Sequence, residues 1–111
     1  MKILYFDDFK LGILRGDDVV DVSAVVSDIP HTGPHDLISG LIASFDDYRS
    51  TLEKLAEEGE GVPAASVRIR PPLPKPGKID CMAVNYMEDG TLSAPAPINA
   101  FHKAPEAVIG C

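Results

Sequence analysis

The side chains best suited to chemistry lie in one short polar stretch, which reads Asn85, Tyr86, Met87, Glu88, Asp89 and Gly90. The Asn amide can donate and accept hydrogen bonds, the Tyr offers a hydroxyl, and the carboxylates Glu88 and Asp89 are candidate general bases. The stretch follows an apolar run that we expect to be a buried strand, and ligand sites often lie at strand ends. On spacing alone, however, a solvated surface turn is the commoner explanation of such a stretch.

Lys103 is a second candidate, within the sequence Phe101-His102-Lys103-Ala104-Pro105. Most lysines are solvated, but an ammonium at a strand end beside acidic side chains can hold an anionic substrate. We expect His102 to point to the opposite face, because side chains alternate along a strand. Lys103 is therefore a candidate substrate-binding residue, whereas His102 is a weaker candidate for catalysis.

Other groups of polar residues are explained without a functional site. His31 and His35 have a spacing at which a helix can present two metal ligands, but Gly33 and Pro34 between them break helical geometry. The acidic residues between positions 53 and 60 suit the solvated face of a helix. No glycine-rich phosphate loop is present, which argues against nucleotide binding.

The composition limits the possible partners. A net charge of −7 and a pI of about 4.7 argue against nucleic acid, whose backbone requires clustered Lys and Arg. No apolar run reaches the ~20 residues that cross a bilayer, and the N-terminus lacks the features of a secretory signal. The two cysteines lack the CxxC spacing, and we expect Cys81 to be a buried thiol. These features predict a cytoplasmic protein without a membrane or nucleic-acid partner.

The N-terminal half predicts strands followed by helix. Residues 1–22 hold three short apolar runs separated by Asp7-Asp8 and by a turn at Gly16, which predicts a three-stranded meander. Apolar residues then recur every three or four positions over residues 37–55, the pattern of an amphipathic helix. Asp36 is the expected N-cap, and residues 44–47 could divide the stretch into two helices.

Residues 62–69 predict a short extended segment that leads into a run of prolines. Pro71, Pro72, Pro74 and Pro76 exclude a helix and indicate a stiff connector between two modules, although a polyproline ligand is an alternative. Beyond the connector we expect a buried strand over residues 79–84, a polar loop over 87–97 and another strand over 98–103.

Residues 71–110 resemble the entry to the catalytic domain of the fumarylacetoacetate hydrolase family. The resemblance rests on elements that occur in order, namely PPLPKPGKI, Asn85-Tyr86, a loop with Pro95 and Pro97, Phe101-x-Lys103-x-Pro105, and Ile109-Gly110. Residues 1–22 are more faintly similar to the family's accessory N-terminal domain. The resemblance implies an α+β chain in two parts. Residues 1–69 would be the accessory domain, a small β-meander plus helix, and residues 70–111 the first strands of a β-rich mixed β-roll, cut short.

The family resemblance also implies an activity for the parent protein. Members cleave or rearrange small 2-oxo and diketo acids by C–C bond hydrolysis, decarboxylation or isomerisation, with Mg²⁺ or a similar cation held by carboxylates. By resemblance, Asn85, Tyr86 and Lys103 bind the substrate, and the protein is a cytoplasmic homodimer.

Two departures from the family pattern limit that expectation. Many hydrolytic members follow Asn-Tyr with x-Asp-His and a later Glu that activate water, whereas this chain reads Met87-Glu88-Asp89 with Leu92 in the Glu position. Asp89 and Glu88 are then the remaining candidate bases. The family's metal-binding carboxylates lie beyond the matched residues, so we expect no metal ligands in these 111 residues and an inactive isolated chain. The alternative is a non-catalytic acidic α+β module that pairs with another chain.

Overall fold

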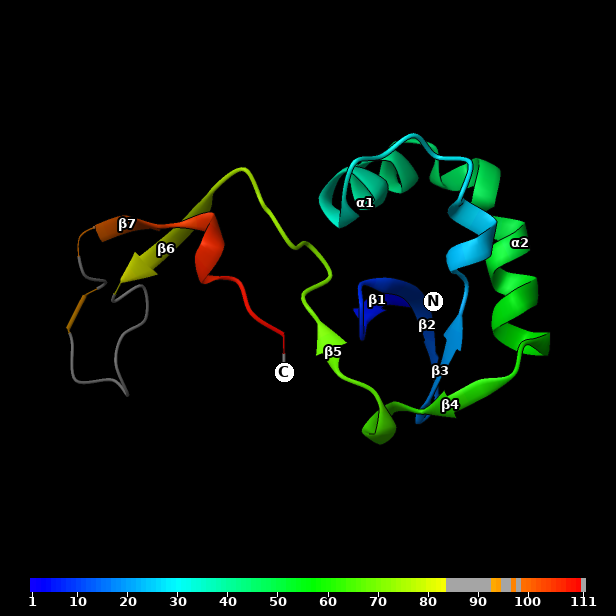
Figure 1. The fold of residues 1–111 in the computed structure, drawn as a ribbon. Helices are drawn as coiled ribbons and strands as arrows, with labels where there is room; N and C mark the ends of the chain where they lie inside the picture. The colour runs from blue at the N-terminus through cyan, green and yellow to red at the C-terminus, as the bar shows by residue number, and fades with distance from the viewer. Residues whose placement is uncertain (84–92, 95–96, 98, 111) are drawn as a thin grey trace. The chain divides into compact units, whose positions relative to one another are not determined.

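The computed structural model describes residues 1–83, 93–94, 97 and 99–110. Within them the chain forms two compact units. Unit 1 comprises Met1–Pro74 together with the described residues from Val108 onward, and unit 2 comprises Lys75–Ala107. Figure 1 follows the chain from one unit through the other.

Unit 1 is built on a five-stranded sheet with the order β4-β3-β2-β1-β5. Its strands are β1 (Lys2–Phe6), β2 (Lys10–Arg15), β3 (Asp18–Asp21), β4 (Gly61–Pro63) and β5 (Ile69–Arg70). All neighbouring strands are antiparallel, with Ile3 opposite Ile13 and Ile13 opposite Val20 in the central three. The predicted meander of residues 1–22 is therefore confirmed, and Gly16 adopts the positive φ of 59° that its turn requires.

Two helices follow the meander after a short 3₁₀ turn, η1 (Ser23–Val26). They are α1 (Pro34–Ala43) and α2 (Phe45–Glu58), divided at Ser44 as the sequence predicts. The expected N-cap at Asp36 is wrong, because α1 begins at Pro34 with Gly33 as its N-cap. Proline suits the first helical position, since its fixed φ is helical and its missing N–H would have had no helical partner there.

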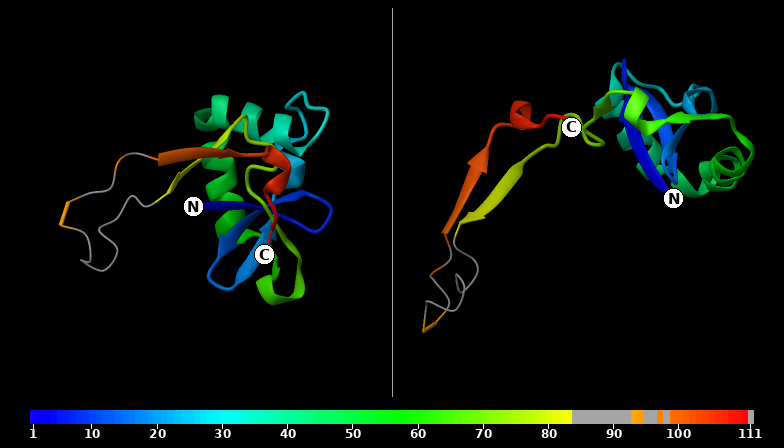
Figure 2. Two further views of the ribbon diagram at one scale, coloured as in Figure 1. Left: turned by 90° about the vertical axis from the view of Figure 1, so that its left-hand side faces the viewer. Right: turned by 90° about the horizontal axis from the view of Figure 1, so that it is seen from below.

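The core of unit 1 lies between the sheet and the two helices. Alternate residues on the strands point toward the helices and meet their apolar faces. The buried cluster consists of Tyr5, Leu11, Ile13, Val20, Val22, Val26, Ile29, Leu37, Ile38, Leu41 and Leu52. Both helices thus cover the same face of the curled sheet, which Figure 2 shows from two further sides. The α+β class is confirmed.

The segment between α2 and the prolines is less regular than expected. A 3₁₀ turn, η2 (Ala64–Ser66), separates β4 from β5, so residues 62–69 are not one extended stretch. The two short strands lie at opposite edges of the sheet, and the turn allows the chain to cross from one edge to the other. The proline run that follows is non-helical, as predicted.

Unit 2 contains an antiparallel ribbon of β6 (Ile79–Ala83) and β7 (Asn99–Lys103), followed by the 3₁₀ turn η4 (Pro105–Ala107). The expected burial of the strand at 79–84 is wrong, because β6 alternates half-buried and exposed residues and β7 is exposed throughout. Among the described residues of unit 2, no further strand or helix covers either face of the ribbon. A two-stranded ribbon alone has no interior in which a side chain can be buried.

Candidate functional site

Four of the predicted site residues lie outside the described residues. These are Asn85, Tyr86, Glu88 and Asp89, which follow the last residue of β6, Ala83. Their roles in substrate binding and catalysis stay predictions. The structure describes the strand that leads to them and the strand that carries the fifth predicted residue.

Lys103 is exposed at the C-terminal end of β7. The antiparallel register places it opposite Ile79, at the start of β6, whereas Ala83 at the other end lies opposite Asn99. Four residues of strand at about 3.3 Å each separate these ends by roughly 13 Å. Lys103 is therefore remote from the end of β6 that continues toward Asn85, a separation that sequence order alone does not reveal.

His102 forms a cross-strand pair with Asp80 that the sequence analysis missed. The two residues are opposite each other in the register, and imidazole Nδ1 lies 2.5 Å from carboxylate Oδ1. Because side chains alternate, this pair and Lys103 point to opposite faces of the ribbon. Both members are largely exposed, so their attraction is screened by water and stabilises little. The pairing could have been found only by guessing the register of the two strands.

The face of the ribbon opposite to His102 and Asp80, which also carries Lys103, is the apolar one. Ile79, Cys81 and Ala83 are half-buried there, and Phe101 lies opposite Cys81. Phe101 is 46% exposed. Cys81 is a free cysteine and only half-buried, which corrects the expectation of a buried thiol. Its surroundings differ because the ribbon carries no covering layer within the described part of unit 2.

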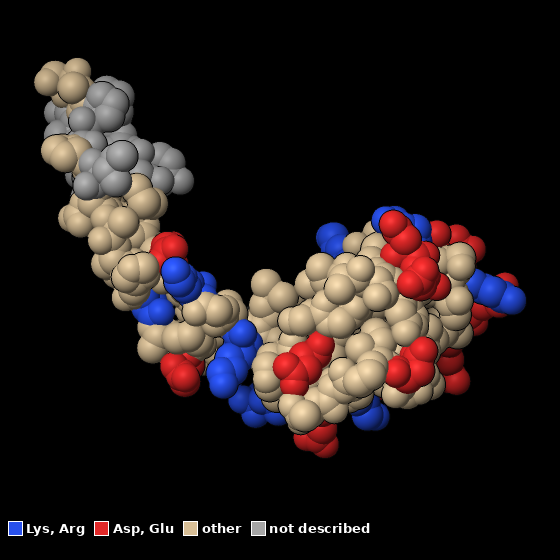
Figure 3. Space-filling view, turned by 90° about the horizontal axis from the view of Figure 1, so that it is seen from above, with Lys and Arg blue, Asp and Glu red and all other residues tan. Residues whose placement is uncertain are grey.

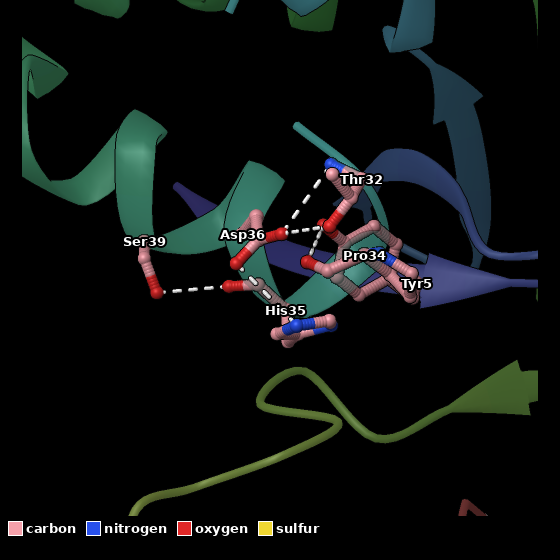
Figure 4. A network of polar contacts seen from close by, with 6 residues as sticks. All are labelled: Tyr5, Thr32, Pro34, His35, Asp36 and Ser39. Carbon is pink, nitrogen blue, oxygen red and sulfur yellow. Dashed lines mark hydrogen bonds and ion pairs between the residues drawn. The ribbon is translucent and has the colours of Figure 1, made fainter. Parts of the chain in front are cut away.

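His35 belongs to a structural network around the start of α1 (Figure 4). The backbone N–H of Thr32 donates to Asp36 Oδ2 at 3.3 Å, and the Thr32 hydroxyl donates to the same oxygen. These two hydrogen bonds lower the pKa of Asp36 below its ordinary value, with a small further contribution from the neighbouring histidines. His35 Nε2 lies 3.4 Å from Asp36 Oδ1. The carboxylate thus ties the loop before α1 to its first turn.

The remaining contacts of this network also have structural roles. His31 Nδ1 lies 2.6 Å from the carbonyl oxygen of Ile29, so this ring is engaged with its own loop. The Tyr5 hydroxyl donates to the Pro34 carbonyl at 2.7 Å, and burial raises the pKa of Tyr5 to about 12. Ser39 donates to the carbonyl of His35 at 2.8 Å. Both rings thus have local contacts, His31 in the loop before α1 and His35 in the first turn of the helix, where the sequence predicted a solvated loop.

Charged side chains of one sign do not gather into a single patch on the face of unit 1 that Figure 3 shows. Acidic side chains are scattered over that face with basic ones between them (Figure 3). Within residues 1–83, 93–94, 97 and 99–110, no three His, Cys, Asp or Glu side chains gather as a metal site requires. The described side chains therefore do not fit a metal by themselves. Across the same residues, no helix is both long and apolar enough to span a membrane.

The sequence is similar to maleylpyruvate hydrolase of Aquipseudomonas alcaligenes. The two are 33% identical over 87 residues, which are 78% of this chain and 30% of that enzyme. The predicted family resemblance is confirmed, because this relative is an enzyme of the fumarylacetoacetate hydrolase family. No profile of a known protein family matches the sequence.

Solved structures of the fumarylacetoacetate hydrolase family share the fold of the chain. Maleylpyruvate hydrolase from Sphingobium sp. SYK-6, crystallised with manganese(II) and pyruvate, matches 98% of the chain with a TM-score of 0.78 and 28% identity. A second structure of that hydrolase matches 98% with a TM-score of 0.75 and 28% identity. The chain spans 39% and 38% of these two structures, so it corresponds to about two fifths of such an enzyme.

Proposed function

We propose that this chain is the N-terminal part of a metal-dependent enzyme that acts on a small 2-oxo or diketo acid. The observation that carries the proposal is the match of 98% of the chain to a hydrolase crystallised with manganese(II) and pyruvate. Pyruvate is a 2-oxo acid, and Mg²⁺ and Mn²⁺ both favour the oxygen ligands that such acids supply. In this proposal residues 1–69 are the accessory domain and residues 70–111 begin the catalytic domain. The protein works as a cytoplasmic homodimer.

The chain's own residues would bind and orient the substrate. The exposed ammonium of Lys103 suits a carboxylate, with which it can form charge-assisted hydrogen bonds. Asn85 and Tyr86 would hold the oxo group through their amide and hydroxyl. Because Lys103 lies at the end of the ribbon away from Ala83, the last residue of β6, we assign it to the distal end of an extended substrate. An acid with a second carboxylate beyond the diketo group meets that requirement.

C–C bond hydrolysis is the first candidate reaction, because the similar enzymes are named hydrolases. Decarboxylation or isomerisation is the second, because the sequence lacks the His of the family's water-activating pair. Asp89 with Glu88 would then remove the proton, although an ordinary carboxyl with a pKa of about 4 is a weak base at pH 7. In all three reactions the bound metal would polarise the oxo-carboxylate.

The test uses the natural protein that contains this chain, purified from its source. Acylpyruvates and 2-oxo diacids would be supplied with Mn²⁺, with Mg²⁺ or with a chelator, and pyruvate and carbon dioxide would be measured. Release of pyruvate that stops on chelation supports hydrolysis; carbon dioxide or an isomer alone supports the second candidate. If no product forms with either metal or with the chelator, and Mn²⁺ does not raise the unfolding midpoint, the non-catalytic module that pairs with another chain is favoured.

A further inference from the structure

The edge strand β5 is the last strand of unit 1 before the chain enters unit 2, and the returning chain passes beside it. β5 has two residues, and its ladder with β1 consists of Tyr5 opposite Arg70 and Phe6 opposite Ile69. The chain passes from β5 through the prolines into unit 2, and the residues from Val108 onward belong again to unit 1. A two-residue edge strand forms few hydrogen bonds, so other contacts must fix it.

The turn between β1 and β2 is strained beside this strand. Asp7 has a φ of 46° and Phe9 a φ of 59°, and neither residue is glycine. A side chain at positive φ is crowded by its own backbone, and such residues persist only where surrounding contacts hold them. The contacts that hold these two come from the neighbourhood of β5.

Asp7 is hydrogen-bonded to the last residue of β5, Arg70, and to the residue before the strand, Arg68. Its N–H donates to the carbonyl of Arg68 at 2.8 Å, and its Oδ1 accepts from the N–H of Arg68 at 2.9 Å. Its carbonyl oxygen accepts from Nε of Arg70 at 2.6 Å. The strained turn thus holds the chain at Arg68 and at Arg70, on either side of Ile69.

The ring of Phe9 also contacts β5, through the side chain of Arg70. The guanidinium of Arg70 lies 5.3 Å from the centroid of that ring, within the range of a cation–π contact. The ring of Tyr5 meets Phe9 edge-on with centroids 5.8 Å apart. Phe9 therefore joins a buried core residue to the side chain of Arg70, and its positive φ is the conformation that places it there.

The returning chain contacts the same strand. A Cβ added at Gly110 would collide with the carbonyl oxygen of Ile69 and lie 2.8 Å from Cα of Arg70. The backbone at Gly110 therefore passes directly against β5, and only glycine allows that approach. β5 lies next to the outgoing and the returning ends of the chain at once.

We propose that Asp7, Phe9 and Arg70 form a latch that holds β5 at the edge of the sheet, next to the returning backbone at Gly110. This conformational role is independent of the function proposed above, because it concerns unit 1 alone. In this proposal the strained turn fixes the position of β5, the strand that directly precedes the proline run.

Limited trypsin digestion of the full chain tests the latch at one peptide bond. Arg68–Ile69 is a trypsin site, whereas Arg70–Pro71 resists cleavage because proline follows. In Arg70→Met the aliphatic stem remains but the hydrogen bond to Asp7 and the cation–π contact are lost. We expect Arg68–Ile69 to be cleaved about tenfold faster, with no acceleration at Arg49 or Lys54 in α2.

Arg49→Met is the matched control. Arg49 also stacks on an aromatic ring, with its guanidinium 4.7 Å from the Phe45 centroid, but it lies on α2 away from β5 in sequence. We expect its cleavage rate at Arg68–Ile69 to equal that of the unchanged chain. If Arg70→Met also leaves that rate unchanged, or accelerates cleavage equally at all sites as global unfolding would, the latch is wrong.

Two further variants keep the test decisive if Arg70→Met folds poorly. Phe9→Gly keeps the positive φ without strain and removes the side chain with its ring, so faster cleavage at Arg68–Ile69 would support the role of the ring in holding β5. Gly110→Val should displace the returning chain and loosen β5, which would speed hydrogen exchange at the amide of Asp7, the donor to the carbonyl of Arg68. Unchanged cleavage in the first variant and unchanged exchange in the second would overturn the proposal.

Discussion

The guanidinium of Arg15 on β2 donates to the backbone carbonyl of Glu57 at the end of α2, 2.9 Å away and 42 residues later in the sequence. The same nitrogen donates to the carbonyl of Ala56 at 3.0 Å. The last carbonyls of a helix have no helical partner and carry the negative end of its dipole, so a cation there is favourable. A single side chain thus ties the sheet to the end of the helix that covers it.

Replacement of Arg15 should weaken this tie. For Arg15→Met we expect the free energy of unfolding to fall by about 1–2 kcal/mol, because two carbonyls lose a charged donor. Urea unfolding followed by circular dichroism measures the change. Lys54→Met, which removes an exposed partner of Glu58 on the same helix, should change stability by less than about 0.5 kcal/mol. Equal losses in the two variants would contradict the proposed role of Arg15.

Tyr5 should make the protein sensitive to alkali. Its pKa is raised from 10.0 to about 12 by burial, so between these values the unfolded chain loses the proton while the folded chain keeps it. Stability is therefore unaffected below pH 10 and falls by up to about 1.4 kcal/mol per pH unit above it. Tyr5→Phe should remove this fall. It should also cost about 1 kcal/mol at pH 7, because the Pro34 carbonyl loses its donor.

The comparison of urea unfolding at pH 8 and pH 11 measures the alkaline effect. Tyr48 needs its own control, since its pKa is also raised, first by desolvation and then by its hydrogen bond to Asp28. Tyr48→Phe should retain the steep fall that Tyr5→Phe abolishes. A fall of the same size in the Tyr5→Phe chain would show that the buried hydroxyl is not its source.

Asp36 should make the protein sensitive to acid, whereas Tyr5 makes it sensitive to alkali. Its pKa is lowered by the two hydrogen bonds from Thr32, so the folded chain holds the proton less tightly than the unfolded chain. The contribution is present above the ordinary value of 3.8 and is lost as the pH falls through the lowered pKa. Asp36→Asn should have an unfolding midpoint that is lower at pH 7 and less sensitive to acid than that of the unchanged chain. Asp46→Asn, at an exposed position in the first turn of α2, should keep the acid sensitivity.

Gly12 is required by close packing on the face of the sheet away from the helices. An added Cβ would lie 2.7 Å from Cγ1 of Val19 and 3.0 Å from the ring of Phe6, both of which are buried. Gly12→Ala should therefore lower the free energy of unfolding by about 1–3 kcal/mol through overpacking. At Gly77 nothing lies within 4 Å of such a Cβ, so Gly77→Ala should leave the thermal midpoint unchanged or slightly raised. A harmless Gly12→Ala would mean that Val19 and Phe6 can move apart.

Lys103 should affect substrate binding more than turnover. In the natural enzyme, Lys103→Met should raise KM about tenfold for an oxo acid with a distal carboxylate, with a smaller change in kcat. The same variant should change KM little for an oxo acid without that group, because the ammonium is assigned to the distal end. Lys54→Met on the surface of α2 is the control for general loss of positive charge. A loss of kcat alone, equal for both substrates, would contradict the assignment of Lys103 to the distal carboxylate.

Local sequence patterns were sufficient to predict most of the secondary structure of unit 1. The three strands of residues 1–22 and the helix break at Ser44 follow from alternation, from the three- and four-residue spacing and from turn residues, all of which act within a few positions. The N-cap of α1 was misplaced by three residues, at Asp36 instead of Gly33, because Pro34 and Asp36 both suit the start of a helix. Pairings between distant residues, such as Asp80 with His102, were not predicted.

The sequence by itself determined the family, the meander and the two helices, because motifs and periodicity are properties of neighbouring residues. Only the tertiary structure decided that β5 takes the edge beside β1, that Arg15 meets the end of α2, and that Lys103 lies opposite Ile79. Strand order and register depend on which distant segments bury apolar surface together and pair their backbone groups. That choice belongs to the whole chain, so short-range patterns leave it open.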